Sequence, residues 1–165
     1  MQYDISTDTT DFIAMWEDFR AHAYWDATGK VWTCGYGHTS GVTRQTVCSV
    51  LTAKQWMRDD CRPIVKYLNS LNLNIKQTQF DAIVDFTFNV GLGNLQKSTL
   101  LKLLRQGAPA EKVAAEFLKW TRSGGKVLNG LCIRREGEYM LYLNDKYPTW
   151  GEAKKHYTQR TGRRI

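Results

Sequence analysis

Two carboxylates close to the N-terminus have the residue types that acid–base chemistry requires. Glu17 follows Trp16 at the edge of an apolar stripe, where partial burial would favour the protonated, proton-donating carboxyl. Asp26 opens the polar turn sequence Asp-Ala-Thr-Gly and is expected to stay ionised. One proton donor and one carboxylate are the pair that cleavage of a glycosidic bond generally requires. The sequence therefore offers Glu17 and Asp26 as an acid and its carboxylate partner.

The same residues also have a purely structural interpretation. A glutamate at the edge of an amphipathic helix is usually solvated, and an aspartate in a turn usually caps its own backbone. Thr33 alone is typical of a strand residue, and His38, which follows a glycine, is typical of a loop. Spacing by itself leaves both interpretations open.

Other kinds of active site lack their sequence motifs here. The chain has no G-x-x-x-x-G-K-[ST] phosphate loop, no G-x-G-x-x-G fingerprint and no G-x-S-x-G elbow. The histidines are scattered, and the cysteines have no zinc-like spacing, so we expect neither a metal nor a cofactor. In a reducing compartment the four cysteines are expected to be idle thiols.

A helix and a hairpin must position the two carboxylates. Apolar residues recur at helical spacing from Phe12 to Phe19, which predicts a first helix that begins after Thr10 and carries Glu17. Residues 24–39 predict a hairpin that turns at Asp26.

In the returning strand of this hairpin, side chains alternate between two faces. Trp32 and Cys34 share the face that is expected to pack inward. Thr33 is on the other face, which would be turned to solvent or to a cleft.

The rest of the chain predicts helices. A capping box at Thr52-Ala-Lys-Gln55 predicts the start of a long helix, and the nearly all-round apolar segment 78–90 predicts a central buried one that Gly91 ends. Ser98 is the expected cap of the next helix. The expected helices span about 52–68, 78–90, 99–106, 109–120, 133–144 and 150–156, with a loop at 123–126.

The charge is unevenly distributed along the 165 residues. Residues 1–75 hold 7 basic and 8 acidic side chains, whereas residues 76–165 hold 16 basic and 8 acidic ones, within a net charge of +7. Such a balance attracts polyanions such as nucleic acids or bacterial envelope polymers. Neither a signal peptide nor a long apolar span is visible, so we expect no membrane insertion.

The quoted carboxylates belong to a series of segments that resembles the phage-type lysozymes, glycoside hydrolase family 24. The resemblance extends over roughly residues 12–144 in the family's order. Its segments are Glu17-x8-Asp26, 32–39 (WTCGYGHT), 80–91 (FDAIVDFTFNVG), 97–100 (KSTL), 124–131 (GGKVLNGL) and 134–138 (RREGE).

This resemblance implies an α+β, mostly α, lysozyme-like bilobal fold. A small N-terminal β-hairpin lobe would span about 12–58 and a larger helical lobe with a basic tail about 59–165, in a single domain of residues 1–165. The implied reaction is hydrolysis of the β-1,4 bond between N-acetylmuramic acid and N-acetylglucosamine in peptidoglycan, with no metal or cofactor.

The resemblance also implies residue roles. Glu17 would be the general acid, Asp26 the second carboxylate, and Thr33 would hold the attacking water, which gives inversion at the anomeric carbon. The implied sugar contacts are Tyr36, His38, Thr39, Phe88 and Ser98.

Two details of the sequence bear on these roles. Thr33 follows the turn glycine, Gly29, by four residues, one more than in the family pattern, so the turn is expected to absorb the extra residue. Either Arg134 or Arg135 could face the cleft; alternatively, Arg134 forms a surface pair with Glu138 one turn on.

The implied biology is that of an endolysin. It would be a monomer made in the host bacterial cytoplasm before lysis, would reach the periplasm and cell wall with the help of a holin, and would bind peptidoglycan and not nucleic acid. Two other classes remain open at this level: a cationic nucleic-acid-binding module and a lysozyme-fold protein that binds the wall without cleaving it.

Overall fold

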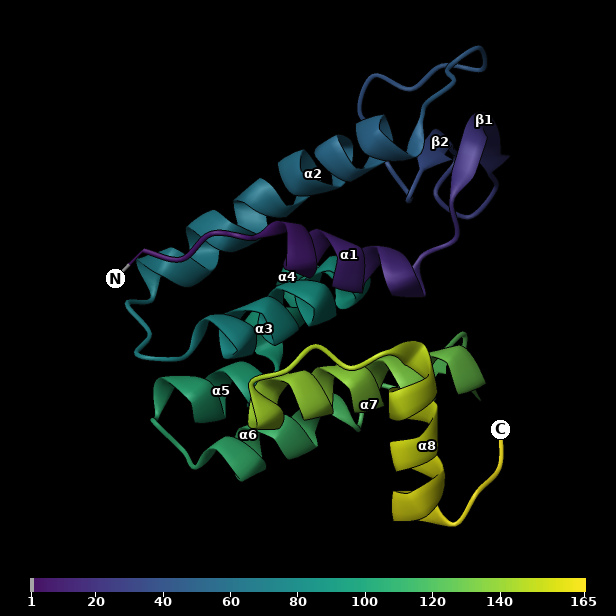
Figure 1. Ribbon diagram of the computed structural model, residues 1–165. Coiled ribbons are helices and arrows are strands. Elements are labelled where there is room, and N and C mark those ends of the chain that lie inside the picture. Colours follow the sequence, from purple (N-terminus) through teal and green to yellow (C-terminus); the bar gives the residue numbers. More distant parts are fainter. Residues whose placement is uncertain (1) are drawn as a thin grey trace. The chain divides into compact units, whose positions relative to one another are not determined.

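A computed structural model describes residues 2–165, which fall into two compact units (Figure 1). The smaller unit is Ile5–Pro63. The larger unit contains Ile64–Ile165 together with the N-terminal residues up to Asp4. Each unit has its own helices and its own two-stranded sheet.

The first helix of the smaller unit, α1, spans Thr7–Trp16 and begins earlier than predicted. Ser6 caps it in a capping box with Thr9, because each side chain accepts a hydrogen bond from the other residue's backbone N–H. The helix also ends earlier, so Glu17 is its C-cap, with extended backbone (φ −100°, ψ 139°), and the prediction that Glu17 lies on the helix is wrong. The reason is that Phe19 packs on Tyr36, with ring centroids 5.4 Å apart, and not along the helix stripe.

The predicted hairpin is confirmed as β1 (Arg20–Asp26) and β2 (Val31–Gly35), paired antiparallel. Asp26 lies opposite Val31, so the connecting turn has four residues, and one of them, Lys30, has a positive φ of 52°. Nearer the start of β1 the register shifts between Arg20 and Tyr24.

The hairpin covers a small core around Cys34, Cys48 and Ala53. The two thiol sulfurs are 3.3 Å apart, and both side chains are buried. Gly35 (φ 67°) comes so close to Ala53 that a side chain there would meet its Cβ at 2.8 Å. Thr33 on the opposite face is only 4% exposed, so this side chain is not turned to open solvent, and the alternative that it faces a cleft stays a prediction.

Helix α2 spans Val50–Ser70 and contains Pro63. Its N-terminal cap is Ser49, whose hydroxyl accepts a hydrogen bond from the Thr52 backbone N–H at 3.1 Å. The predicted capping box at Thr52 is therefore wrong by about one turn, because a serine three residues earlier supplies the acceptor.

In the larger unit, α3 (Gln77–Val90) is the predicted central helix, buried on every side from Phe80 to Thr87 and ended by Gly91 at φ 88°. Helix α7 (Asn129–Asn144) packs against α3 and α6, and also against α8 (Figure 1). The predicted cap at Ser98 is confirmed: it begins α5 (Thr99–Arg105), and its hydroxyl accepts from the Leu101 N–H.

The remaining elements differ from the prediction in length or were missed. Helix α4 (Leu92–Lys97) was not predicted, and α6 spans Ala110–Phe117 and ends before Trp120. The predicted loop contains a two-residue hairpin, β3 (Arg122–Ser123) and β4 (Lys126–Val127), whose two central glycines have the positive φ angles that such a turn requires.

The last helix, α8 (Trp150–Thr161), is about a turn and a half longer than predicted. A capping box of Thr149 and Glu152 begins it, and two side chains from its later turns, His156 and Arg160, bind the fully buried Glu136 of α7. The contacts with Glu136, which is distant in the sequence, thus account for the greater length of α8, whose own composition is polar.

The predicted fold class, mostly helical with a small β-hairpin, is confirmed. No helix in the described part of the chain is both long and apolar enough to cross a membrane.

Candidate functional site

The three predicted catalytic residues all lie in the smaller unit. Glu17 ends α1, Asp26 ends β1 and Thr33 is in β2. The predicted sugar contacts Tyr36, His38 and Thr39 follow in the same unit, whereas Phe88 and Ser98 belong to the larger one.

Glu17 leaves α1 in extended conformation, three residues before β1 begins. Its side chain is half-buried. The preceding turn is fixed by packing, because the Trp16 ring meets Phe12 edge-on with centroids 5.5 Å apart. A half-buried carboxyl on a rigid helix end is a suitable position for a proton donor.

Asp26 combines a structural role in the turn with an available carboxylate oxygen. Its Oδ1 accepts a hydrogen bond from the Thr28 backbone N–H at 2.9 Å, which fixes the start of the turn. Its Oδ2 lies next to Gly29, where a side chain would come within 2.9 Å of it. The glycine therefore leaves room for the second carboxylate oxygen, which the turn itself does not use.

Thr33 lies opposite Tyr24 in the hairpin and is buried. Its hydroxyl donates only a long hydrogen bond, 3.5 Å, to the Val31 carbonyl oxygen. A bond at this distance is weak, so the hydroxyl can turn toward a better partner at little cost.

His38 is held firmly by the protein. Its backbone exchanges two 2.9 Å hydrogen bonds with Cys34, its Nδ1 lies 2.8 Å from Asp60 Oδ2, and its ring stacks on Trp56 with centroids 4.7 Å apart. Tyr36 packs on Phe19, whereas Thr39 is exposed. The sequence contained no signal for the contribution of Asp60, which comes from a helix 22 residues further on.

In the larger unit, Phe88 is half-buried in the last turn of α3. Ser98 is 8% exposed, and its hydroxyl is used twice by the backbone: it donates to the Leu95 carbonyl oxygen at 2.7 Å and accepts from the Leu101 N–H at 3.1 Å. The cap role of Ser98 is thus structural, and its sugar contact stays a prediction.

A buried charge cluster joins α3 and α7, and sequence reasoning missed it. Arg134 binds Asp85 through Nη2 at 2.8 Å and Nε at 3.2 Å, and Arg135 Nη2 lies 2.7 Å from Glu138 Oε1. The predicted pair between Arg134 and Glu138 one turn on is present, with Arg134 Nε 3.7 Å from Glu138 Oε1, but both side chains are buried, so its predicted surface location is wrong.

Burial governs the charge of Glu138. Desolvation raises the pKa of Glu138 well above its usual value, and the neighbouring Arg135 guanidinium opposes this only in part. The sequence offered only a cleft-facing arginine or a local pair with Glu138 here, because the partner Asp85 lies 49 positions away.

No group of three or more histidine, cysteine or acidic side chains could hold a metal ion within residues 2–165. The arrangement offers acid–base chemistry from carboxyl and hydroxyl groups.

The fold and the carboxylates at its hairpin define a lysozyme-like protein. The muramidase domain of SpmX from Asticaccaulis excentricus superposes with a TM-score of 0.80 at 30% identity, covering 87% of this chain and 99% of that one. An endolysin from Escherichia coli O157:H7 phage FAHEc1 gives 0.77 at 30% identity, covering 90% and 98%.

The family follows from the sequence match. The phage lysozyme family model matches residues 14–138, and this chain belongs to that family. It is 45% identical over 143 residues to the endolysin of Bacillus phage B103. The aligned region covers 85% of this chain and 54% of that protein. The chain spans about half the length of the first curated relatives it matches.

Proposed function

We propose that this chain hydrolyses the β-1,4 bond between N-acetylmuramic acid and N-acetylglucosamine in bacterial peptidoglycan during phage-induced lysis. The observation that carries the proposal is the pair of half-buried carboxylates, Glu17 at the end of α1 and Asp26 at the hairpin turn, within one compact unit of a phage lysozyme family member.

In this reaction Glu17 donates its proton to the glycosidic oxygen while the bond between that oxygen and the muramic acid C1 breaks. A water molecule, held by the Thr33 hydroxyl, attacks C1 from the opposite face, and Asp26 takes its proton. One water is consumed and the configuration at C1 is inverted. The weak hydrogen bond of Thr33 supports its role, because this hydroxyl gives up little when it binds water.

The predicted substrate contacts fall into two groups, according to whether their side chains are already held by contacts within the protein. Thr39 is exposed and Phe88 half-buried, so both have surface to offer a sugar. The side chains of Tyr36, His38 and Ser98 are already held by contacts within the protein. We propose that they shape the sugar subsites indirectly, by fixing the backbone segments around them.

We further propose that the two units work as one lysozyme-like domain in a monomer. The protein would accumulate inside the host, and a membrane-opening partner of the holin type would give it access to peptidoglycan. The net charge of +7 supports attraction to an anionic wall.

The test is Glu17→Gln, which keeps the side-chain shape and removes the proton donor. Wall lysis and release of reducing ends are expected to fall about 100- to 10,000-fold, because general acid catalysis typically contributes that much. In the same assay Asp26→Asn is expected to be severely impaired and Thr33→Ala weaker but measurable.

The matched control is Asp18→Asn, which changes the adjacent, exposed carboxylate and should leave activity close to wild type. Thermal unfolding of Glu17→Gln should stay near the wild-type value. Full activity of Glu17→Gln would refute the acid assignment, and an anhydro sugar in the digest, seen by mass analysis of muropeptides, would replace hydrolysis with transglycosylation.

A further inference from the structure

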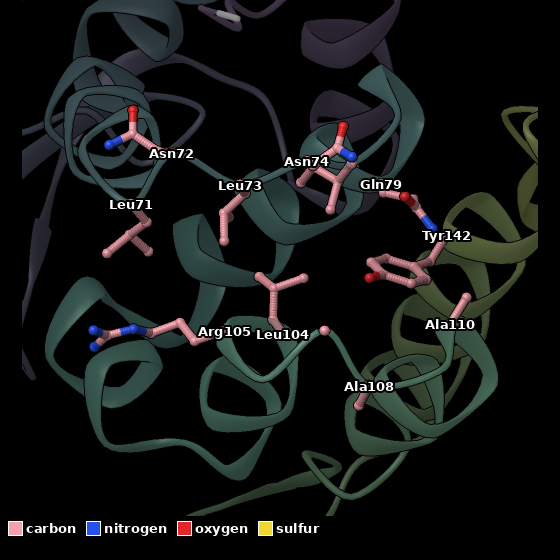
Figure 2. Close-up of a pocket in the computed structure, with 12 residues that line it drawn as sticks. Leu71, Asn72, Leu73, Asn74, Gln79, Leu104, Arg105, Ala108, Ala110 and Tyr142 are labelled. Atoms are coloured by element: carbon pink, nitrogen blue, oxygen red, sulfur yellow. The ribbon is translucent and has the colours of Figure 1, made fainter.

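The larger unit contains a pocket of about 630 Å³ that the proposed reaction does not use (Figure 2). Its walls are the segment 71–75 that joins α2 to α3, the end of α5 with the following loop, and Tyr142 of α7. This volume lies in the range of pockets that hold small molecules or short peptides.

Tyr142 contributes a hydroxyl group to this pocket. Its side chain is 3% exposed, and Figure 2 shows its hydroxyl directed toward the centre of the pocket. Within residues 2–165 this hydroxyl has no hydrogen-bond partner, and burial raises the pKa of Tyr142 to about 12, so the phenol stays protonated even in mildly alkaline solution. The hydroxyl oxygen is not among the fully buried side-chain atoms that lack a partner in the described chain, so it faces the pocket and is accessible to an acceptor from a ligand.

A second donor, the Gln79 amide of α3, also lines this pocket. Its Oε1 accepts a hydrogen bond from the Lys76 backbone N–H at 2.9 Å. Its amide nitrogen is therefore the end that remains for a ligand. This end of the pocket can therefore bind a hydrogen-bond acceptor, such as a carbonyl or a carboxylate.

The middle and the far end have different chemistry. Leu73 and Leu104 point toward each other across the middle of the pocket, and Arg105 extends away from Tyr142 at the other end (Figure 2). Arg105 is exposed and makes no ion pair within the described chain. Along the pocket, hydrogen-bond donors at one end are followed by an apolar middle and then by the unpaired guanidinium of Arg105.

We propose that this pocket binds the short, carboxylate-bearing peptides that cross-link bacterial peptidoglycan, as a site separate from glycan cleavage. Peptide carbonyls accept hydrogen bonds from Tyr142 and Gln79, alanine methyl groups rest on Leu73 and Leu104, and a peptide carboxylate pairs with Arg105. The inference rests on the proposed function, which makes peptidoglycan the substrate.

The pocket suits a peptide better than a sugar. Sugar rings bind on open aromatic faces, but the Tyr142 ring is buried and packed near Phe117, with centroids 5.7 Å apart. The lining side chains include both donors and acceptors, because Asn72 and Asn74 carry amide oxygens in addition to amide nitrogens, so they can pair with both the N–H and the C=O groups of a peptide backbone. Peptide binding would hold the enzyme on cross-linked wall and lower its KM there without changing kcat on short glycans.

The experiment titrates the synthetic tetrapeptide L-Ala-γ-D-Glu-L-Lys-D-Ala into the full chain and follows backbone amide shifts by NMR. Saturable shifts are expected at residues 71–75 and 104–108. Tyr142→Phe, which removes only the hydroxyl, and Arg105→Gln should each weaken binding by about tenfold. Lys102→Gln is the matched control, because it removes an exposed cation on the same helix that does not line the pocket.

Activity gives a second readout. Tyr142→Phe should raise KM several-fold for cross-linked wall and leave kcat for a soluble, peptide-free glycan unchanged. Absence of saturable peptide shifts, or shifts at these residues with a tetramer of N-acetylglucosamine in place of the peptide, would overturn the proposal.

The two proposals fail separately. If Glu17→Gln abolishes hydrolysis while Tyr142→Phe binds the peptide like wild type, the peptide site is wrong and the glycosidase stands. If the peptide binds as expected and Glu17→Gln remains fully active, the catalytic assignment is wrong and the peptide site stands.

Discussion

At the scale of single residues, His38 shows how one side chain can hold a loop. Its ring contacts Asp60 on one edge and Trp56 on one face, while its backbone is tied to Cys34. These contacts fix the segment that leads from β2 to the exposed Thr39. The loop is therefore positioned by packing from α2 and not by its own sequence.

Asp60→Ala is predicted to lower the free energy of unfolding by about 1–3 kcal/mol, because it removes a hydrogen bond to a buried ring nitrogen. Denaturant unfolding measures the change. Arg62→Gln is the control: its partner Asp59 is 2.8 Å away, but the pair is exposed, so a change below about 0.5 kcal/mol is expected. Equal effects of the two variants would show that the His38 contact contributes no more than a surface pair.

At the scale of helices and strands, sequence patterns predicted the features that depend on residues close to one another along the chain. The buried periodicity of α3, its glycine end and the Ser98 cap were all visible in the sequence. The missed features depend on partners far along the chain. Glu17 leaves its helix because Phe19 packs on Tyr36, and Arg134 is buried because Asp85 of another helix receives it.

The charge cluster between α3 and α7 gives a pH prediction. Because burial raises the pKa of Glu138 above 4.5, the folded state holds this proton more tightly than the unfolded chain. The contribution of Glu138 to stability is thus complete in acid and is lost as the pH rises above about 4.5 toward the raised value. The stability of wild type relative to Glu138→Gln should fall over that range, as measured by urea unfolding at several pH values.

Glu152 supplies a control of opposite sign. Hydrogen bonds from Thr149 at the start of α8 lower the pKa of Glu152 to about 2. Its contribution is therefore present above about 4.5 and is lost as the pH falls toward 2, so the difference between wild type and Glu152→Gln should grow with rising pH. Parallel pH profiles for the two variants would contradict the assigned directions.

At the scale of the whole molecule, the sequence predicted the family, since six segments in the right order carry more information than any spacing. The site was only partly predictable. Residue types identified the carboxylates, but Asp60 and the donors around Tyr142 are brought to their places by tertiary packing. No local pattern encodes such neighbours.

Net charge predicts a salt-dependent encounter with the wall. Lys154, Lys155 and Arg164 line a groove along α8, in the half of the chain that carries most of the basic residues. Binding to isolated walls should weaken several-fold between about 0.05 and 0.2 M salt, because screening shortens the reach of this charge. Pelleting assays measure it, and the double variant Lys154→Gln/Lys155→Gln should flatten the salt response. An unchanged response would exclude this groove as a wall contact.

The burial of every cysteine has a practical consequence. Cys34, Cys48, Cys61 and Cys132 are all inaccessible thiols, and desolvation raises the pKa of Cys48 to about 11, which suppresses its nucleophilic form at neutral pH. The native protein can therefore accept one new cysteine on an exposed position in each unit and carry maleimide dyes or spin labels there alone. Energy transfer between such dyes would follow the two units during turnover without first removing any natural thiol.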